Sequence, residues 1–431
     1  MSLRYYGALH RLHCGLVWLV LALIVMIAIL VSSAGQLRVA RVPAVSDDDL
    51  TTMQSGRNNT HVIIVGAGAA GLSAAYTLEY VNVPYTLLEA SATFGGRVRE
   101  MTDFIDNVPL DVGAEWIHVM PRVLQDLLLF PEDDASLIDI IDYQPQTISF
   151  FRRGKRRRRN FFRFFYQEYK FRNTTWWSYF STFFYPYVAE SIRFNAVVDR
   201  IEYQPHPRGS QQTASMTVTT VDGRQFVGTH VILAVPASML QDRTIAFTPN
   251  MDESFWRTMD DIAVADGLKV WLEFDERFYP DLQATQSMLH SLEAQPLFFD
   301  AVFRKHTDKN VLCLFNVNQK EASKMATKSD TEIVEETMGL LQKIFDRSDL
   351  KEHLLQSRVL NWSREPLIRG AYTWNYGDYD QTFLRRSLYD GHLWLAGEYL
   401  ARSDTATVHG AAISGREAAL QILSNLQEQQ A

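Results

Sequence analysis

A glycine-rich turn near residue 66 constrains the fold of this chain more than any other feature of its sequence. The segment HVIIVGAGAAGLSAAYTLE begins with an apolar strand, continues with Gly66, Gly68 and Gly71 in GxGxxG spacing, and then has the small residues of a closely packed helix. A second apolar stretch, PYTLLEA, ends in Glu89, eighteen residues after Gly71. This order of strand, turn, helix and strand predicts a doubly wound α/β domain that binds a dinucleotide.

Each of these residues has a chemical reason to bind such a ligand. Gly66 permits the tight turn, Gly68 lets the backbone approach a pyrophosphate, and Gly71 lets the helix pack against the strand. The helix N-terminus attracts the negative charge of the phosphates, and Glu89 can accept hydrogen bonds from ribose hydroxyls. A glutamate suits NAD and FAD equally, so this turn alone leaves the cofactor open.

The length and composition indicate a globular protein of two domains. The chain has 431 residues, of which 47% are apolar and 21% charged, enough to bury a large core without disulfides. Its two cysteines, Cys14 and Cys313, are far apart in sequence, which argues against a disulfide framework, and two are too few for a zinc site. The eleven histidines show no HExxH spacing, so we expect no metal.

The charge of the chain is unevenly distributed. The formal net charge is −8, although RRGKRRRRN over 152–160 contains seven positive residues, so the rest of the chain is acidic. An acidic body mildly favours cationic substrates at long range. Aromatic residues follow the basic run, a combination that could suit anionic lipid or single-stranded nucleic acid. A solvated loop leading into an aromatic packing segment is the more common outcome, so no nucleic-acid partner is expected.

An uncharged apolar stretch lies near the N-terminus. Its seventeen residues, 15–31, would form a helix about 25 Å long, against about 30 Å for a hydrocarbon layer. We interpret residues 1–60 as a signal-anchor or a cleaved signal peptide followed by a polar tether, with a buried core helix as the alternative. The protein is then expected at a membrane, in the secretory pathway or outside the cell. Its topology stays open, because the flanking arginines are balanced.

Three further motifs distinguish FAD from NAD. SATFGGRV, with Gly95, Gly96 and Arg97, forms a second glycine turn whose guanidinium can bind a pyrophosphate bidentately. LDVGAEWIH follows at 110–118, and LWLAGEYLARSDTATVHGAAISGREAA lies at 393–419. In this order the motifs resemble those of the flavin-containing amine oxidase family, and within it the polyamine oxidase branch. The resemblance runs from His61 to the C-terminus and implies FAD as the cofactor.

The resemblance also implies roles for individual residues. Arg97 and Glu398 would contact FAD at its pyrophosphate and ribityl chain, and Val198 would lie beside the adenine. Gly113, Ala114, Glu115, Trp116 and Trp362 would lie along the flavin ring, with Thr407 and Val408 at its pyrimidine end, where a last helix begins. His118, Tyr372 and Thr407 would face the substrate.

Lys269 lies in the middle of a predicted strand, DGLKVWLEF over 266–274. Alternation places it on the face opposite Leu268, Val270 and Leu272, so it is either an edge-strand charge or a group turned toward a cavity. The resemblance implies the second role, with the lysine bonded to a water beside flavin N5. A positive group there helps to stabilise charge that develops when electrons pass to oxygen.

Two departures from the family affect these expectations. The cysteine that attaches flavin covalently is absent, and Cys313 lies in the probable buried strand NVLCLFNV, so FAD should be held noncovalently. The segment from Phe150 to Tyr187, which in the family supplies helices over the substrate tunnel, is short here. The substrate pocket is therefore expected to be more open.

The sequence predicts a two-domain α/β protein with an FAD/NAD(P)-binding Rossmann-like fold of amine oxidase type. The FAD-binding domain would comprise 61–135, 188–245 and 385–431, and a mixed-sheet substrate domain would comprise 136–187 and 246–384. The expected reaction is oxidation of an amine, with a polyamine favoured, by FAD and O2 to an imine and H2O2. One alternative is another flavin oxidase of this fold.

An L-amino-acid oxidase is one such enzyme, and it would need an arginine aimed at a carboxylate, for which Arg304 and Arg369 are candidates. A second alternative is a membrane-tethered flavin-binding protein without amine oxidase activity.

Overall fold

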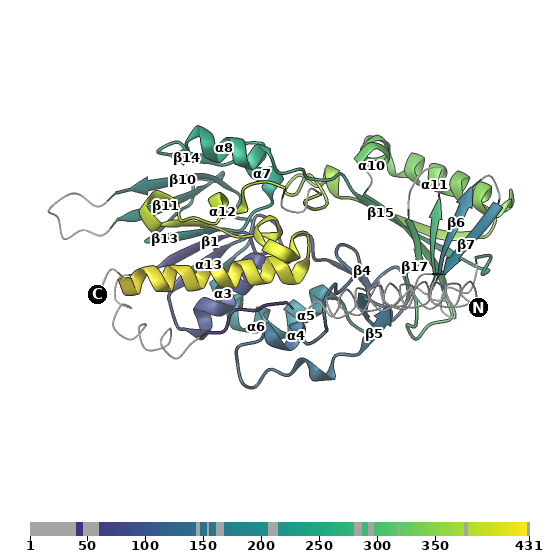
Figure 1. The fold of residues 1–431 in the computed structure, drawn as a ribbon, viewed down its shortest axis with the longest axis horizontal. Coiled ribbons are helices and arrows are strands. Elements are labelled where there is room, and N and C mark those ends of the chain that lie inside the picture. The colour runs from purple at the N-terminus through teal and green to yellow at the C-terminus, as the bar shows by residue number, and fades with distance from the viewer. Residues whose placement is uncertain are drawn as a thin grey trace, which may run out of the picture.

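The computed structural model describes residues 40–45, 60–143, 147–152, 155–160, 168–205, 214–279, 287–291, 297–317, 319–374 and 378–428. These residues form two lobes, one with helices α3 (Ala69–Tyr80) and α13 (Val408–Glu428) and one with strand β15 (Leu268–Phe274), as Figure 1 shows. The apolar stretch 15–31, on which the predicted anchor rests, lies outside them. No helix among the residues described is long and apolar enough to cross a membrane.

A five-stranded parallel sheet forms the centre of the first lobe. Its order is β20 (Leu393–Leu395), β13 (His230–Leu233), β1 (Val62–Val65), β2 (Tyr85–Leu88) and β9 (Ile192–Arg193). All four residues of β1 are buried, because helices or a second sheet cover both faces of a parallel sheet. The predicted Rossmann-like fold is confirmed.

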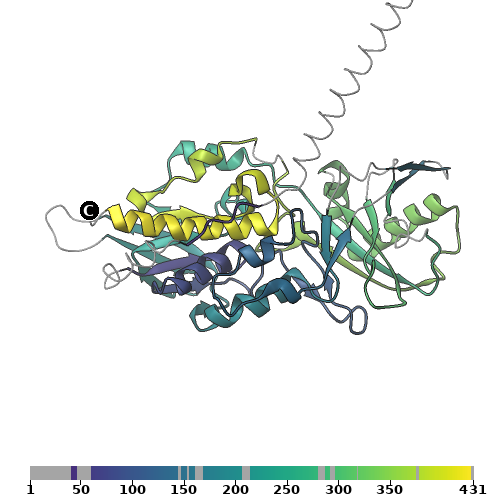
Figure 2. The same ribbon diagram turned by 60° about the horizontal axis from the view of Figure 1, so that its bottom comes forward.

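Helices α3 and α13 lie side by side, as Figures 1 and 2 both show. The approach is so close that a Cβ added to Gly415 would stand 1.9 Å from the Ala70 carbonyl oxygen. Arg416, also on α13, is buried and donates to the carbonyl oxygens of Pro43, Asp126 and Leu127. The last helix therefore binds segments from the beginning of the described chain.

A four-stranded sheet packs beside the parallel sheet in the same lobe. It has the order β12 (Gln225–Gly228), β11 (Ser215–Thr220), β10 (Val198–Gln204) and β14 (Ala246–Thr248). Helices α7 (Ala237–Gln241), α8 (Glu253–Asp260) and α12 (Gln381–Leu384) complete this part of the core.

A seven-stranded mixed sheet forms the second lobe. Its order is β19 (Leu354–Asn361), β15, β18 (Asn310–Asn316), β17 (Leu297–Asp300), β16 (Ser287–Ser291), β6 (Thr147–Arg152) and β7 (Lys155–Asn160). Strand β16 runs parallel to β6, and the other pairs are antiparallel. Helices α10 (Gln319–Ala326) and α11 (Asp330–Phe345) lie against the sheet. The capping box of Ser329 and Glu332 starts α11.

Strand β15 is an inner strand of this sheet, and the edge-strand interpretation of Lys269 is therefore wrong. It pairs with β18 on one side and β19 on the other, and all seven of its residues are buried. Lys269 cannot be a solvated edge charge, because its side chain is only 2% exposed.

The chain between β2 and β9 also includes β3 (Glu100–Met101), β4 (Leu110–Asp111), α4 (Val123–Asp126), β5 (Ile140–Tyr143), β8 (Glu168–Phe171), α5 (Trp176–Phe183) and α6 (Tyr185–Val188). Trp176, Tyr179 and Phe180 of α5 pack in the same apolar core as α3, although the predicted division assigns 136–187 to the substrate domain. The domain boundaries stay a prediction.

Candidate functional site

One cavity of about 960 Å³ is lined by residues of both lobes. The glycine turns of 66–71 and 95–97 line it from the first lobe, and β15 and the segment 362–372 line it from the second. This volume lies within the range of pockets that bury a large organic ligand. The elements that the sequence singled out at both ends of the chain therefore meet at one site.

The first glycine turn is shaped so that a ligand can approach its backbone. A Cβ on Gly71 would stand 1.8 Å from the Gly66 carbonyl oxygen, and Gly66 itself has φ +100°. A Cβ on Gly68 would meet its nearest neighbour, the Gly95 carbonyl oxygen, only at 3.9 Å. Space beside Gly68 is thus left for a ligand, at the N-terminus of α3, where no side chain caps the helix amides.

Glu89 stands at the end of β2 and faces the same part of the cavity. Its carboxylate accepts hydrogen bonds from the Ala67 amide at 2.7 Å and from the Ser91 amide at 2.9 Å. Val198, the first residue of β10, lines the cavity nearby. These positions agree with a ribose site and an adenine site, and both roles stay predictions.

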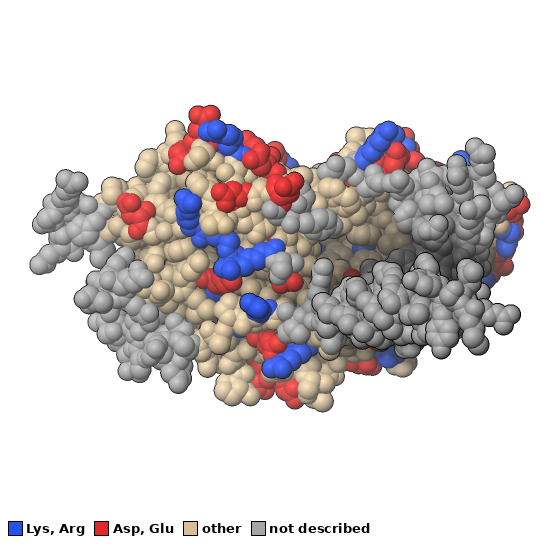
Figure 3. Space-filling view, viewed as in Figure 1, with Lys and Arg blue, Asp and Glu red and all other residues tan. Residues whose placement is uncertain are grey.

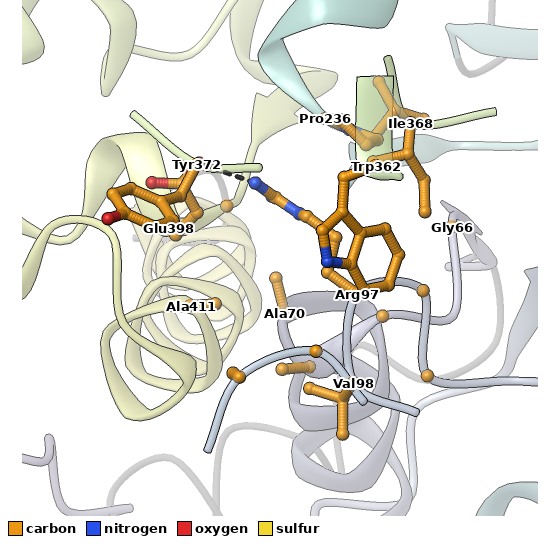
Figure 4. Close-up of a pocket in the computed structure, with 18 of the residues that line it drawn as sticks. Gly66, Ala70, Arg97, Val98, Pro236, Trp362, Ile368, Tyr372, Glu398 and Ala411 are labelled. Carbon is orange, nitrogen blue, oxygen red and sulfur yellow. Dashed lines mark hydrogen bonds and ion pairs between the residues drawn. The ribbon is translucent and has the colours of Figure 1, made fainter. Parts of the chain in front are cut away.

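Arg97 and Glu398 form an ion pair in the cavity wall (Figure 4). Arg97 Nη1 lies 3.0 Å from Glu398 Oε1 and 2.9 Å from the Ala371 carbonyl oxygen. Glu398 also accepts hydrogen bonds from the Thr373 hydroxyl at 3.1 Å and the Ala406 amide at 3.1 Å. The two residues, 301 positions apart, fix each other beside the place where the pyrophosphate is predicted.

The residues predicted beside the flavin ring also line this cavity, as does Tyr372, which was predicted to face the substrate. The ring-side residues are Gly113, Ala114, Glu115, Trp116, Trp362, Thr407 and Val408. Figure 4 shows Trp362 and Tyr372 on the wall with Arg97. Val408 begins α13, as the sequence predicts, and the Thr407 hydroxyl accepts a hydrogen bond from the Gly410 amide at 3.0 Å. The Thr407 side chain therefore caps the helix.

A short antiparallel pairing positions two charged residues that the sequence did not single out, Glu168 and Lys170, of which Glu168 lines the cavity. Ile117 and Tyr169 exchange both backbone hydrogen bonds, which places His118 opposite Glu168 and Trp116 opposite Lys170. His118 Nδ1 lies 2.7 Å from Glu168 Oε2, and both residues line the cavity. Glu168 therefore fixes the orientation of the His118 ring at this wall of the cavity.

Lys269 lines the cavity and belongs to a buried group of charged residues. Its Nζ is 2.8 Å from Glu115 Oε2 and 3.4 Å from the Asp111 carbonyl oxygen. The other carboxylate oxygen of Glu115 pairs with Lys170 Nζ. Burial alone would raise the pKa of Glu115, but Lys170 and Lys269 outweigh it and hold the pKa below its ordinary value. Glu115 is thus a carboxylate shared by two ammonium groups.

The only sequence signal for Glu168 and Lys170 is the alternation in QEYKF, where a charged residue lies on each side of Tyr169. In GLKVW, by contrast, one charged residue lies between apolar neighbours, and QEYKF belongs to the stretch predicted to be an aromatic packing segment after a solvated loop. In the structure all four residues of β8 are buried.

The fold and site define a two-lobed flavoprotein with a Rossmann-like nucleotide domain. Residues 64–128 match the NAD(P)-binding Rossmann-like domain, and residues 188–423, more than half of the chain, match the family described as flavin containing amine oxidoreductase. The chain belongs to this flavin-containing amine oxidase family.

Curated relatives include polyamine oxidases from plants and animals. Polyamine oxidase 1 of Zea mays is 26% identical over 54% of this chain and 45% of its own length. Polyamine oxidase 2 of Arabidopsis thaliana is 23% identical over 83% of this chain and 87% of its own. The human peroxisomal N(1)-acetyl-spermine/spermidine oxidase is 30% identical over 49% of this chain and 46% of its own. The match thus spans less than half of the maize and human relatives.

Two solved structures show the same fold. Putrescine oxidase bound to putrescine has a TM-score of 0.66 and 16% identity over 85% of this chain and 99% of that chain. Cyclohexylamine oxidase from Brevibacterium oxydans has a TM-score of 0.67 and 16% identity over 86% of this chain and all of that chain.

FAD fits the residues that are present. The glycine turns leave a floor that side chains would fill, Glu89 and the Arg97–Glu398 pair stand along it, and the ring-side residues continue it to α13. No cysteine is among the residues that line the described cavity, and Cys313 is buried in β18. These facts agree with noncovalent FAD.

Proposed function

We propose that this protein oxidises an amine with FAD and O2, and that polyamines are its natural substrate class. Bound FAD would take a hydride from the carbon next to the amine nitrogen and pass the electrons to O2, which yields an imine and H2O2. Water would then hydrolyse the imine. The family membership and the polyamine oxidases among the relatives support the reaction type.

The His118–Glu168 pair on the cavity wall is the main support for polyamines as the substrate class. An amine must lose a proton at the reacting nitrogen before a hydride can leave, and a carboxylate-held imidazole can take that proton. Glu168 also places negative charge where a distant ammonium group of the same substrate would be attracted. Trp116 and Phe315 line the cavity as well, and aromatic rings attract cations.

An amino-acid substrate has less support, because neither of the two arginines predicted for a substrate carboxylate, Arg304 and Arg369, has a position that favours this role. Arg369 lines the cavity, but its Nη1 lies 2.6 Å from Asp242 on an exposed part of the wall. Arg304 is not among the residues that line the described cavity.

The test is anaerobic mixing of the FAD-loaded protein with spermine, spermidine, their acetylated forms, benzylamine and a panel of L-amino acids. We expect the polyamines to bleach the flavin absorbance, faster as pH rises and neutral amine becomes available, and peroxide to form when air is admitted. Bleaching by amino acids only would transfer the assignment to an amino-acid oxidase. Full FAD occupancy without any bleaching would reject amine oxidation by this chain.

Replacement of Glu168 tests the role of the His118–Glu168 pair directly. Glu168→Gln keeps the shape but removes the charge, so the apparent Kd for spermine should rise at least tenfold, about 1.4 kcal/mol, while benzylamine is affected less. Glu352→Gln, at an exposed position away from the cavity, removes the same charge and should change neither value. An equal effect of both variants would show that only the overall charge matters.

A location at a membrane or in the secretory pathway remains part of the proposal, supported only by the composition of 15–31. Fractionation of the full chain and of a chain that starts at residue 40 would test it. Equal distribution of both between membrane and soluble fractions would reject an anchor.

A further inference from the structure

We propose that Lys170 is a positioning residue of the flavin site, which restores the positive charge that Glu115 would otherwise cancel at Lys269. The inference requires that FAD binds but does not depend on which amine, if any, is the substrate. It concerns a residue that does not line the cavity itself and acts through Glu115, which does.

The three side chains form one buried row. Lys269 comes from β15, Glu115 from the turn before Ile117, and Lys170 from β8. One oxygen of Glu115 pairs with each lysine, and the three side chains are between 2% and 6% exposed. Water cannot screen such charges well, so each contributes strongly to the potential at the adjoining cavity.

The same aromatic rings enclose both ammonium groups. Lys170 Nζ lies 5.8 Å from the ring centre of Trp116 and 5.0 Å from that of Phe299. Lys269 Nζ lies 5.6 Å from each of the same two ring centres. Apolar walls of this kind keep the row dry and hold its members in place.

The second lysine, Lys170, determines the net charge of the row. Glu115 and Lys269 alone form a pair without net charge, so their effects on negative charge at a neighbouring group largely cancel. With Lys170 the row has two ammonium groups and one carboxylate, and a net charge of one positive unit remains beside the cavity. A positive charge there favours the electron-rich form of bound flavin.

Other titratable groups also face the row. Burial, and then the charge of Glu115, raises the pKa of Asp111 to about 8, and burial lowers the pKa of Lys305 to about 8. Asp300 is paired with Arg277 at 2.9 Å, and burial raises the pKa of the Cys313 thiol. The variants are therefore compared at one pH, and Glu115→Gln also removes one cause of the raised Asp111 pKa.

The experiment measures the reduction potential of bound flavin by anaerobic equilibration with reference dyes. Lys170→Met removes the compensating charge and should lower the potential by at least about 30 mV, a tenfold change in the ratio of reduced to oxidised flavin for a two-electron couple. Glu115→Gln removes the carboxylate and should raise the potential. The double variant K170M/E115Q has the original net charge and should return toward the wild-type potential.

Lys351→Met is the matched control, because it breaks an exposed ion pair with Glu335 and should leave the potential unchanged. Opposite shifts of the two single variants, restored in the double variant, support the proposal. Shifts in the same direction, or no shift in either, overturn it. If Lys170 and Glu115 had purely structural roles, the direction of the shift in potential would not depend on the charge that is removed. If Lys170→Met binds no FAD, Glu115→Gln decides: a rise supports the proposal, and no rise or a fall overturns it.

Discussion

Positions 68 and 71 of the first turn require glycine for different reasons. At Gly71 the obstacle is the protein itself, since a Cβ would stand 1.8 Å from a backbone oxygen. At Gly68 the protein leaves space, with φ −76° and ψ −175°, a conformation that alanine also adopts. What Gly68 leaves room for is therefore the ligand.

Alanine at the two positions should separate folding from binding. Gly71→Ala should destabilise the FAD-free protein by about 1–3 kcal/mol or more, because backbone must move. Gly68→Ala should cost at most about 1 kcal/mol at this N-cap but weaken FAD at least tenfold. Thermal melting of the apoprotein and fluorescence titration with FAD measure the two effects. Equal melting temperatures for both variants would contradict this distinction.

Strand β13 contains a buried histidine that makes the parallel sheet sensitive to acid. His230 is 3% exposed and stacks on His392 with ring centres 4.9 Å apart. Burial, and then the charge of His392, lowers the pKa of His230 to about 3. Between about pH 6.5 and pH 3 the unfolded chain therefore binds a proton that the folded chain does not, and stability falls as pH falls.

Replacing this histidine should reduce the acid sensitivity. His230→Phe keeps a stacked ring and removes the proton, so the loss of unfolding free energy on acidification should shrink by about 1.4 kcal/mol per pH unit below pH 6.5. His353→Phe is a control of opposite sign: a hydrogen bond to Asp275 raises the pKa of His353, which stabilises the fold at acid pH. Melting temperatures at neutral and mildly acid pH measure both effects. Equal acid sensitivity of wild type and His230→Phe would refute the assignment.

Elements that depend on local sequence could be predicted, and those that depend on distant pairing could not. Strand β1, the turn to α3 and the start of α13 at Val408 follow from short motifs. The site around Lys269 depends on the pairing of Ile117 with Tyr169, fifty-two positions later. Nothing in either segment specifies that partner, so Glu168 and Lys170 were missed, and the Arg97–Glu398 pair appeared only as two separate residues.

On the scale of the whole molecule, FAD would bind to both lobes at once. The apolar core around β15 and α11 is separate from the two cores of the first lobe, whereas the cavity draws its lining from both lobes. Figure 3 shows positive and negative side chains interspersed among the described residues of one face. Under the proposed function, recognition of charge depends on local groups such as Glu168.

Removal of FAD should therefore loosen the connection between the lobes. We expect two heat-absorption peaks in calorimetry of the apoprotein and a single, higher one with FAD at a hundred times its Kd, where binding adds about 2.7 kcal/mol. Acid precipitation should release the flavin into the supernatant, as noncovalent binding requires. Flavin that stays with the pellet, or a melting profile indifferent to FAD, would contradict this expectation.

The contact between α3 and α13 has a consequence during synthesis of the chain. The ribosome completes α3 early, yet the surface of α3 that receives Gly415 stays uncovered until more than three hundred further residues have been translated. The nascent protein thus exposes an apolar face for most of its translation. Chaperones can bind this face until α13 packs against it. Flavin loading must wait for the final helix, and a premature stop codon anywhere before it should leave a colourless, aggregation-prone product.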